Sequence, residues 1–481
     1  MKKLITLLVA GCMVLGSLGT AAAVDVKVSG QWQWHYGYYS HNSLMSADET
    51  GSHQDRLRFR QRLRVQTRFI ASETLSGMLN FEIGDLNWGN NSNTGASGGR
   101  QGGGLDADGY EIKVKWAFLD WTLPGTQVKT RMGVQALSFP AVVAGNPVFD
   151  ADVAGISVSS QLTPELGLNF FYARPYDSGW GSESANLYDE MDVFGVMVPI
   201  KTSAVRMTPW AAAALIGKDS YYYGNKNVSA ANRNKIRNTA SAPGGYYVGG
   251  RWVDSSNMDS QGYAWWAGTT FQLPILDPFF VNLDAMIGGL ETGDSNYDVD
   301  YGYFVAAKIG YKFSWGTPAF LGWYSSGDKD RDERRIIPGF AEVGGFTMTR
   351  YGFSGTSRRS FDDALGTIGF GMWGAGFEVA NISFVDKLKH TIRAVYMGGT
   401  NDGQSLWGSG AGNKADWTPG DALVTSDHAY EINLLNDYQV SKNLAIALDL
   451  AYLKVELGEQ RSNKDDTKGS FAAMVNLQYS F

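Results

Sequence analysis

The chain ends in the stretch FAAMVNLQYSF, residues 471–481. Successive side chains of an extended strand point to opposite faces, so alternate residues of this stretch share a face. One face carries Phe471, Ala473, Val475, Leu477, Tyr479 and Phe481, and the residues between them are small or polar apart from Met474. The pattern predicts an amphipathic β-strand. Soluble sandwiches and membrane barrels both contain such strands, so the rest of the chain must decide between them.

The other end of the mature chain has the same pattern. Residues 24–38 read VDVKVSGQWQWHYGY, with Val, Trp or Tyr at nearly every second position and polar residues or glycine between them. This period of two again predicts a strand. Both ends of the mature chain are therefore amphipathic strands, as a barrel that closes edge to edge requires.

The first 23 residues predict a secretory signal peptide. Lys2 and Lys3 precede an apolar run over residues 4–18, and three alanines at 21–23 form a cleavage site, so we expect the mature chain to begin at Val24. An alternative interpretation is a lipobox at residues 8–12, which would make Cys12 a lipid-bearing terminus. Cys12 is the only cysteine, so the mature chain has no disulfide, thiolate metal ligand or cysteine nucleophile.

Composition favours a membrane barrel over the other classes. The leader leaves 39 basic against 48 acidic residues, which argues against nucleic acid as a partner. Apart from the leader, no apolar run approaches the roughly 20 residues of a membrane helix. The chain has 59 glycines, 13% aromatic residues and a mean hydropathy of −0.21. These values suit a barrel with an apolar outer face and a wet lumen.

The whole mature chain reads as strands separated by connections of two lengths. We expect eighteen strands, at about residues 24–38, 56–70, 76–88, 110–122, 127–137, 154–162, 165–174, 191–199, 204–216, 261–273, 278–290, 301–314, 318–326, 367–380, 388–399, 428–440, 443–457 and 468–481. Loss of one weak hairpin, within 154–174 or 318–380, would give sixteen.

The connections alternate between short and long. Residues 72–75, 123–126 and 201–203 are short, whereas 40–55 and 217–260 are long. Short periplasmic turns and long external loops are typical of outer-membrane barrels, and the parity places both termini on the periplasmic side. The predicted fold is all-β: a transmembrane antiparallel β-barrel formed by one domain, residues 24–481.

The most specific local feature is DRLRFRQRLRVQTRF, residues 55–69. One strand face carries Arg56, Arg58, Arg60, Arg62, Arg64 and Arg68, and the other face is largely apolar. Permanently charged guanidinium groups about 6 to 7 Å apart repel one another unless water or carboxylates face them. We therefore interpret the row as facing a lumen, with a nucleic-acid strip and a soluble edge strand as the competing interpretations. Lys113, Lys115, Lys129 and Arg131 extend this basic wall onto the fourth and fifth strands.

Taken together, these features resemble those of a known protein family. Its leader, the rhythm of its strands and loops, the basic wall and the terminal Phe481 are similar to those of Gram-negative trimeric porins, nearest to the Desulfovibrio-type homotrimeric porins. The terminal pattern Val475, Leu477, Tyr479, Phe481 resembles the signal that the outer-membrane assembly machinery recognises.

The resemblance implies a homotrimer among outer-membrane lipid and lipopolysaccharide. It also implies that loop 138–154, SFPAVVAGNPVFDADVA, folds into the barrel and brings Phe149, Asp150 and Asp152 towards the basic wall. The loop lacks a PEFGG-like motif, so this transfer rests on strand order alone.

The expected function is passive diffusion of small ions and polar solutes, with weak anion preference set by the arginine row facing the loop carboxylates. Sulfate or small carboxylates are the solutes that the resemblance suggests. An outer-membrane hydrolase and a structural surface barrel are the alternatives. The sequence contains no GxSxG nucleophile elbow. A hydrolase would therefore need a Ser/His pair that only folding brings together.

The remaining motifs are weak, and we expect no enzyme activity, no resident metal and no cofactor. Gly369, Gly371 and Gly374 match GxGxxG, but no helical pattern follows them. The spacing of Asp328, Asp330 and Asp332 matches the start of a calcium-binding loop. The sixth and twelfth positions of the segment do not match that motif. Binding of an adventitious calcium ion at an external loop is kept as an alternative.

Overall fold

The computed structural model describes residues 24–42, 44–45, 55–89, 112–177, 190–217, 247–248, 251–252, 261–292, 298–329, 334–340, 346–352, 370–403, 417 and 423–481. The signal peptide predicted for residues 1–23 and the lipid alternative at Cys12 lie outside these residues, as do Asp330, Asp332 and Gly369.

Eighteen long strands follow one another along the chain. They are β1 (Asp25–Ser40), β2 (Arg56–Ile70), β3 (Leu75–Asn87), β4 (Ile112–Thr122), β5 (Lys129–Ser138), β6 (Asp150–Gln161), β7 (Gly167–Asp177), β8 (Glu190–Met197), β10 (Arg206–Ile216), β13 (Gly262–Gln272), β14 (Phe279–Glu291), β15 (Val299–Tyr311), β16 (Thr317–Ser325), β17 (Met372–Val385), β18 (Leu388–Gly399), β19 (His428–Gln439), β20 (Leu444–Glu456) and β21 (Ser470–Ser480). The two-residue β9 (Ile200–Lys201) follows β8 and also pairs with β10. Two-residue strands β11 (Tyr247–Val248) and β12 (Arg251–Trp252) form a separate hairpin, and η4 (Pro274–Leu276) is a short 3₁₀ turn.

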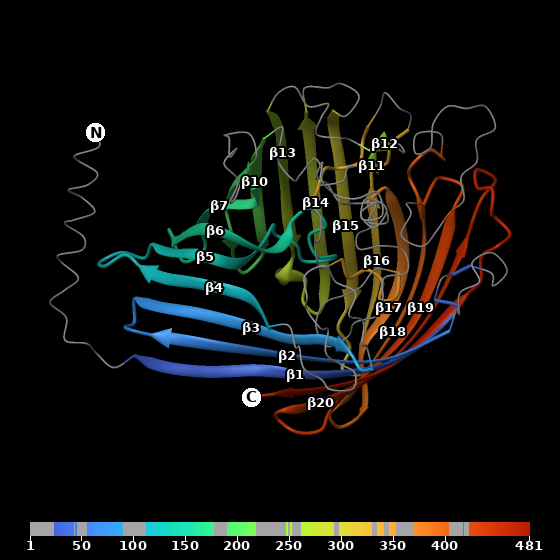
Figure 1. The fold of residues 1–481 in the computed structure, drawn as a ribbon, viewed down its shortest axis with the longest axis horizontal. Helices are drawn as coiled ribbons and strands as arrows, with labels where there is room; N and C mark the ends of the chain where they lie inside the picture. Colours follow the sequence, from blue (N-terminus) through green and yellow to red (C-terminus); the bar gives the residue numbers. More distant parts are fainter. Residues whose placement is uncertain are drawn as a thin grey trace.

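The eighteen strands form one closed antiparallel barrel. Each strand pairs with the next along the chain, and β1 also pairs with β21, from Gln31 opposite Ser480 to Ser40 opposite Phe471. Figure 1 shows the blue first strand beside the red last strands. The predicted closed barrel of about eighteen strands is confirmed, and the sixteen-strand alternative is wrong. None of the described residues forms a helix long and apolar enough to cross a bilayer.

The two faces of the barrel wall differ in chemistry. In β15, Tyr303, Val305 and Ile309 are exposed on the outside, whereas Phe304 and Ala306 between them are fully buried towards the lumen. Most other strands repeat this arrangement of exposed apolar side chains. So large an apolar outer surface fits contact with lipid, because soluble monomers rarely expose contiguous patches of this size.

The barrel has a turn end and a loop end. The turn end carries both termini of the described chain and the short connections 71–74, 123–128, 162–166, 312–316, 386–387 and 440–443. The connections 198–205 and 273–278 also lie at the turn end, and the loop end carries the others, most of which lie outside the described residues. This asymmetry agrees with the predicted alternation of short turns and long loops.

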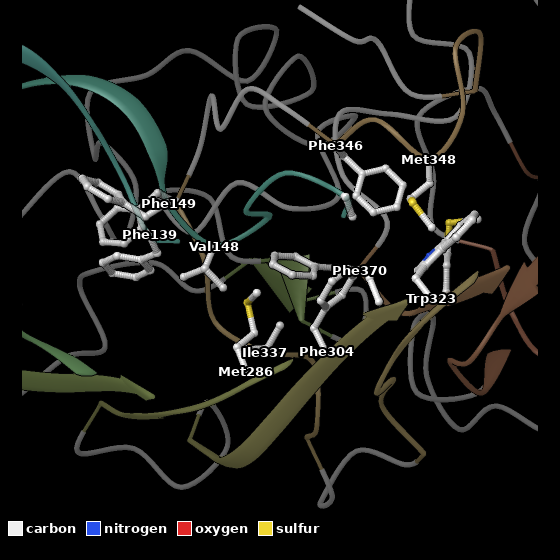
Figure 2. Close-up of a cluster of buried hydrophobic side chains, with 14 of the residues drawn as sticks. Phe139, Val148, Phe149, Met286, Phe304, Trp323, Ile337, Phe346, Met348 and Phe370 are labelled. Carbon is white, nitrogen blue, oxygen red and sulfur yellow. The ribbon is translucent and has the colours of Figure 1, made fainter. Parts of the chain in front are cut away.

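Two segments from the loop end pack inside the barrel. Residues 139–149 connect β5 to β6, and the described residues 334–340 and 346–352 belong to the connection from β16 to β17. Their apolar side chains form one buried cluster with inward-facing strand residues. Figure 2 shows Phe139 and Phe149 in one part of this cluster and Phe346 and Met348 beside Trp323 in another. Each fully buried side chain of this kind stabilises the fold by about 1.5 to 3 kcal/mol.

Gly30 lies where the first and last strands meet, so we expect a single added methyl group there to lower the stability of the barrel strongly. The Gly30 amide donates to the carbonyl of Phe481 at 2.9 Å and the Phe481 amide to that of Gly30 at 3.1 Å. A Cβ here would lie 2.5 Å from the Arg64 carbonyl oxygen. We expect Gly30→Ala to destabilise the barrel by about 1 to 3 kcal/mol, as overpacking does.

The measurement is the urea midpoint of the folded-to-unfolded band shift in detergent. The matched control is Gly77→Ala on β3, whose Cβ would find its nearest neighbour at 3.9 Å. Equal midpoints for the two variants would contradict the proposed role of this contact in closure.

Candidate functional site

The arginine row of β2 lies on the inner face of the barrel wall. Pairing with β1 places Arg60 opposite His35 and Arg62 opposite Gln33, and both partners are buried. The intervening residues point outward, as the exposed Leu57 shows. The structure therefore brings the six arginines onto one inward strand face, Arg56, Arg58, Arg60, Arg62, Arg64 and Arg68.

Two carboxylates lie beside these arginines, and they come from the next two strands along the chain, β3 and β4. The Arg64 Nε donates to Glu82 of β3 at 2.7 Å. Asp120 of β4 accepts from the Nε of Arg131 at 2.7 Å and from the Nη2 of Arg68 at 3.5 Å. Each pair lowers the repulsion along the row and fixes the direction of long side chains.

Sequence reasoning missed both Glu82 and Asp120. Glu82 falls on the inward face of β3, beside the basic strand, and Asp120 on the inward face of β4, one strand further on. Their inward positions near the basic strand are the signal that could have identified them.

The basic wall continues on β5 but breaks on β4. Lys129 and Arg131 of β5 pair with Thr122 and Asp120, on the inward face. On β4, a register shift places Lys113 opposite Glu82 and leaves Lys115 without a partner in the β3 ladder. The expectation that Lys113 and Lys115 share one face therefore does not hold, because a bulge interrupts the period of two.

Lys115 instead pairs with Asp152 of β6. Its Nζ lies 2.7 Å from the Asp152 Oδ2, and the Trp116 indole donates to the Asp152 Oδ1 at 2.6 Å. Asp152 is exposed, as is Ala154, whereas the residue between them, Val153, is buried. Asp152 thus shares the outward face of β6.

The inward-folded loop differs from the expected constriction loop in its chemistry. Strand β6 begins at Asp150, so Asp150 and Asp152 belong to the barrel wall, and residues 139–149 contain no ionisable side chain. Phe149 is 1% exposed and stacks near Phe139 and Phe340, with centroid distances of 5.2 and 4.8 Å. Phe149, Asp150 and Asp152 therefore do not approach the arginines of β2, because the strand begins earlier than the sequence suggested.

A buried carboxylate holds this loop across the lumen. Asp284, on the inward face of β14, accepts backbone N–H bonds from Val142, Val143 and Ala144 at 2.8, 2.8 and 3.3 Å. Asp284 is 0% exposed. Charge-assisted bonds of this kind are worth about 1.5 to 3 kcal/mol each. Sequence reasoning missed Asp284, although it is the only acidic residue on the inward face of β14.

The second inward segment is held by a similar device. Glu431 of β19 accepts backbone N–H bonds from Arg350, Tyr351 and Gly352 at 2.5 to 3.2 Å. Arg393 of β18 donates to the carbonyl of Thr347 at 2.7 Å. Two acidic residues of the wall therefore bind two inward segments through backbone amides.

Arg393 is in turn fixed by a buried carboxylate. Its guanidinium pairs with Glu378 of β17, which also binds Lys308 of β15 at 2.5 Å. Glu378 offsets one of the two positive charges, so the triad keeps one net positive charge in the wall that carries the second segment.

Two cavities open on the lumen near the turn end. One, of about 620 Å³, follows the basic wall and is lined by Arg68, Asp120, Lys129, Arg131, Ser157 and Ser159 among others. The other, of about 650 Å³, lies beneath Val142 and Val143 and is lined by Arg206, Lys308 and Lys312 together with amide side chains. Both cavities therefore present cationic side chains, one on each side of the inward loop.

The predicted assembly residues lie on the outer face of the last strand. Val475 and Tyr479 are exposed by 44% and 42%, Leu477 shares their face, and Phe481 follows at the turn end. Their recognition by an assembly machinery stays a prediction.

Within the described residues, no group of three or more His, Cys, Asp or Glu side chains is placed to hold a metal ion. Asp328 accepts backbone N–H bonds from Arg335 and Ile336 at 2.7 and 3.1 Å. Gly371, from the GxGxxG match, has a positive φ at the start of a strand, where no helix begins. The absence of a cofactor stays a prediction.

Together, the fold and the inward basic face define a transmembrane β-barrel of the outer-membrane type. Among solved structures, the chain is similar to the outer membrane protein OpdK of Pseudomonas aeruginosa, with a TM-score of 0.53 and 10% identity over 95% of this chain and 99% of that one. OccAB3 of Acinetobacter baumannii gives a TM-score of 0.53 and 11% identity over 95% and 99% of the chains. OccK11 (OpdR) of P. aeruginosa gives 0.51 and 11% over 95% and 96%.

At these identities the similarity shows the fold alone. A scan against protein-family models found no match, and a search of the curated proteins found none. A nearer relation to Desulfovibrio-type porins stays a prediction.

The anchoring of the inward loop can be tested without any assumption about function. We expect Asp284→Asn to speed amide hydrogen exchange at Val142 to Ala144 by about tenfold or more, because the loss of one charge-assisted bond is worth at least about 1.5 kcal/mol. The control is Asp277→Asn, which removes an exposed ion pair with Lys312 at the turn end. Unchanged exchange in Asp284→Asn would show that other contacts hold the loop.

Proposed function

We propose that this protein is an outer-membrane porin, a passive channel for small hydrophilic solutes with weak preference for anions. The observation that carries the proposal is the inward basic face of β2 to β5. Nine basic residues stand on it, Arg56, Arg58, Arg60, Arg62, Arg64, Arg68, Lys113, Lys129 and Arg131, with two carboxylates, Glu82 and Asp120.

The mechanism rests on this excess of positive charge. A lumen wall of one sign raises the local concentration of ions of the other sign, because the low-dielectric wall focuses the field. A solute anion can pass from one guanidinium to the next, since neighbours on the strand face stand about 6 to 7 Å apart. The carboxylates at Glu82 and Asp120 keep the preference weak.

The inward loop contributes shape rather than charge. Its anchor at Asp284 holds the segment 142–144 against β14, and its apolar side chains pack away from the basic wall. A transverse field between loop carboxylates and arginines is therefore not part of the proposed mechanism. The loop divides the lumen, with the basic wall on one side and the cavity lined by Arg206, Lys308 and Lys312 on the other.

The proposal also concerns how the channel reaches the outer membrane and what it contacts there. We infer export through a cleaved leader, insertion by the barrel assembly machinery, contact with outer-membrane lipid and lipopolysaccharide, and assembly as a homotrimer. The channel needs no cofactor for this mechanism, and the acidic external loops are where an adventitious calcium ion would bind. Sulfate and small carboxylates are the proposed solutes. No described feature favours a hydrolase or a purely structural barrel.

The test is the reversal potential of the purified protein in a planar bilayer under a potassium chloride gradient. We expect anion preference in the unmodified chain. The combined change Arg58→Gln, Arg60→Gln and Arg62→Gln should lower the anion-to-cation permeability ratio by about twofold or more, because it removes a third of the basic face.

The control has the same change in net charge outside the lumen. It combines Lys387→Gln and Lys442→Gln, which are exposed in turns at the turn end, with Lys454→Gln on the outward face of β20. Clear cation selectivity of the unmodified protein, or equal shifts in both triple variants, would show that the basic face does not set selectivity.

A further inference from the structure

Exposed aromatic residues form two belts around most of the barrel. At the loop end the outward aromatics are Tyr36, Tyr38, Tyr263, Trp265, Tyr301, Tyr303, Tyr324, Tyr396, Tyr452 and Phe471. At the turn end they are Phe69, Trp121, Phe279, Tyr311, Phe313, Trp315, Phe320, Phe384, Tyr438, Tyr479 and Phe481. Such belts mark the two levels at which a barrel meets the lipid head groups.

Both belts have a partial gap on β5 to β10, the neighbouring strands drawn in teal and green in Figure 1, where the outward aromatics are Phe170, Tyr172 and Phe194. The outward residues near the loop end of these strands are Ser138, Asp150, Asp152, Arg174, Glu190, Asp192 and Leu215. Near the turn end they are Thr130, Ser160, Leu168 and Met207. None of these is aromatic, and five of those at the loop end are charged.

The charges in this gap pair with one another on the outside of the wall. Arg174 binds the Asp192 carboxylate with Nε at 2.7 Å and Nη2 at 2.9 Å, and the Tyr172 hydroxyl donates to the same carboxylate at 2.8 Å. Lys115 and Asp152 form the second pair. Charged side chains on a lipid-facing surface are unfavourable, increasingly so towards the middle of the bilayer.

Below the charges the surface is apolar and hollowed. A groove of about 630 Å³ is lined by Ile156, Val158, Phe170, Phe194, Ala211 and Ala213 among others. The rings of Phe170 and Phe194 are 50% and 47% exposed. Protruding aromatic rings beside small residues, with charged pairs at the rim, are the usual composition of a protein–protein interface.

We propose that the outward face of β5 to β10 is the surface through which one copy of this protein contacts the next, an inference that extends the proposed homotrimer. Copies in one membrane share the same depth and orientation, because the aromatic belts fix both. The face therefore presents rings and a groove at one membrane depth, and cations and carboxylates at another. Equivalent faces of neighbouring copies can then meet at matching depths around an axis along the membrane normal.

The size of the face agrees with this assignment. Five strands spaced about 4.8 Å apart, with an apolar band about 25 Å tall, give on the order of 600 Å². Standard interfaces bury about 800 Å² per partner, so the area of this face is of the same order.

Photo-crosslinking at matched phenylalanines tests the interface. Phe194 on β8 and Phe377 on β17 are both outward and are 47% and 41% exposed. Each is replaced by p-benzoylphenylalanine, and cells are irradiated with the protein in its native outer membrane. We expect covalent dimers and trimers of this chain from position 194 and only lipid adducts from position 377. Lipid or lipopolysaccharide adducts alone at 194, a different captured protein, or equal oligomers from both positions would overturn the inference.

A second pair of variants separates the interface from the channel. Ala213→Trp fills the groove, whereas Ala375→Trp adds the same ring to the outward face of β17, five strands further round the barrel. We expect Ala213→Trp to shift the oligomer to monomers on native gels while each barrel keeps its conductance. If the unmodified protein conducts no ions, the proposed function fails, and the crosslinks still decide the interface. Oligomers that resist Ala213→Trp would overturn the inference.

Discussion

The pairing of β1 with β21 is the contact on which the rest of the structure depends. A sheet edge in a bilayer leaves backbone N–H and C=O groups without water, at a cost of several kcal/mol each, so a spanning sheet must close. Closure also creates an inside and an outside. Because side chains alternate along every strand, it sorts the arginines of β2 to one side and residues such as Leu57 to the other.

The lumen is organised by a small number of buried acids. Asp284 and Glu431 each collect backbone N–H groups from a segment that enters from the loop end, and Glu378 fixes the arginine beside the second segment. Backbone amides are suitable partners because they satisfy a buried carboxylate without bringing a second charge. The two segments then pack apolar side chains inside the barrel, and cationic side chains line the lumen on both sides of the first segment.

The outside of the barrel is not uniform. Two aromatic belts follow most of the circumference, and the gap on β5 to β10 carries ion pairs and a groove instead. The Arg174 to Asp192 pair and the basic wall therefore belong to different surfaces, although both contain arginine. The face on which an arginine lies therefore decides which of the two proposed roles it has, contact with solutes or contact with a neighbouring copy.

The sequence by itself predicted most of the strands and their faces, because a period of two is a local property that the terminal stretch 471–481 and residues 55–69 show directly, but it left eighteen and sixteen strands both open. It also located the arginine row and the loop that enters the barrel. Only the tertiary structure decided the partners: the bulge that separates Lys113 from Lys115, the start of β6 that removes Asp150 and Asp152 from the loop, and Asp284 as an anchor 140 residues away from Ala144. These depend on register and on contacts across the lumen, which no local pattern records.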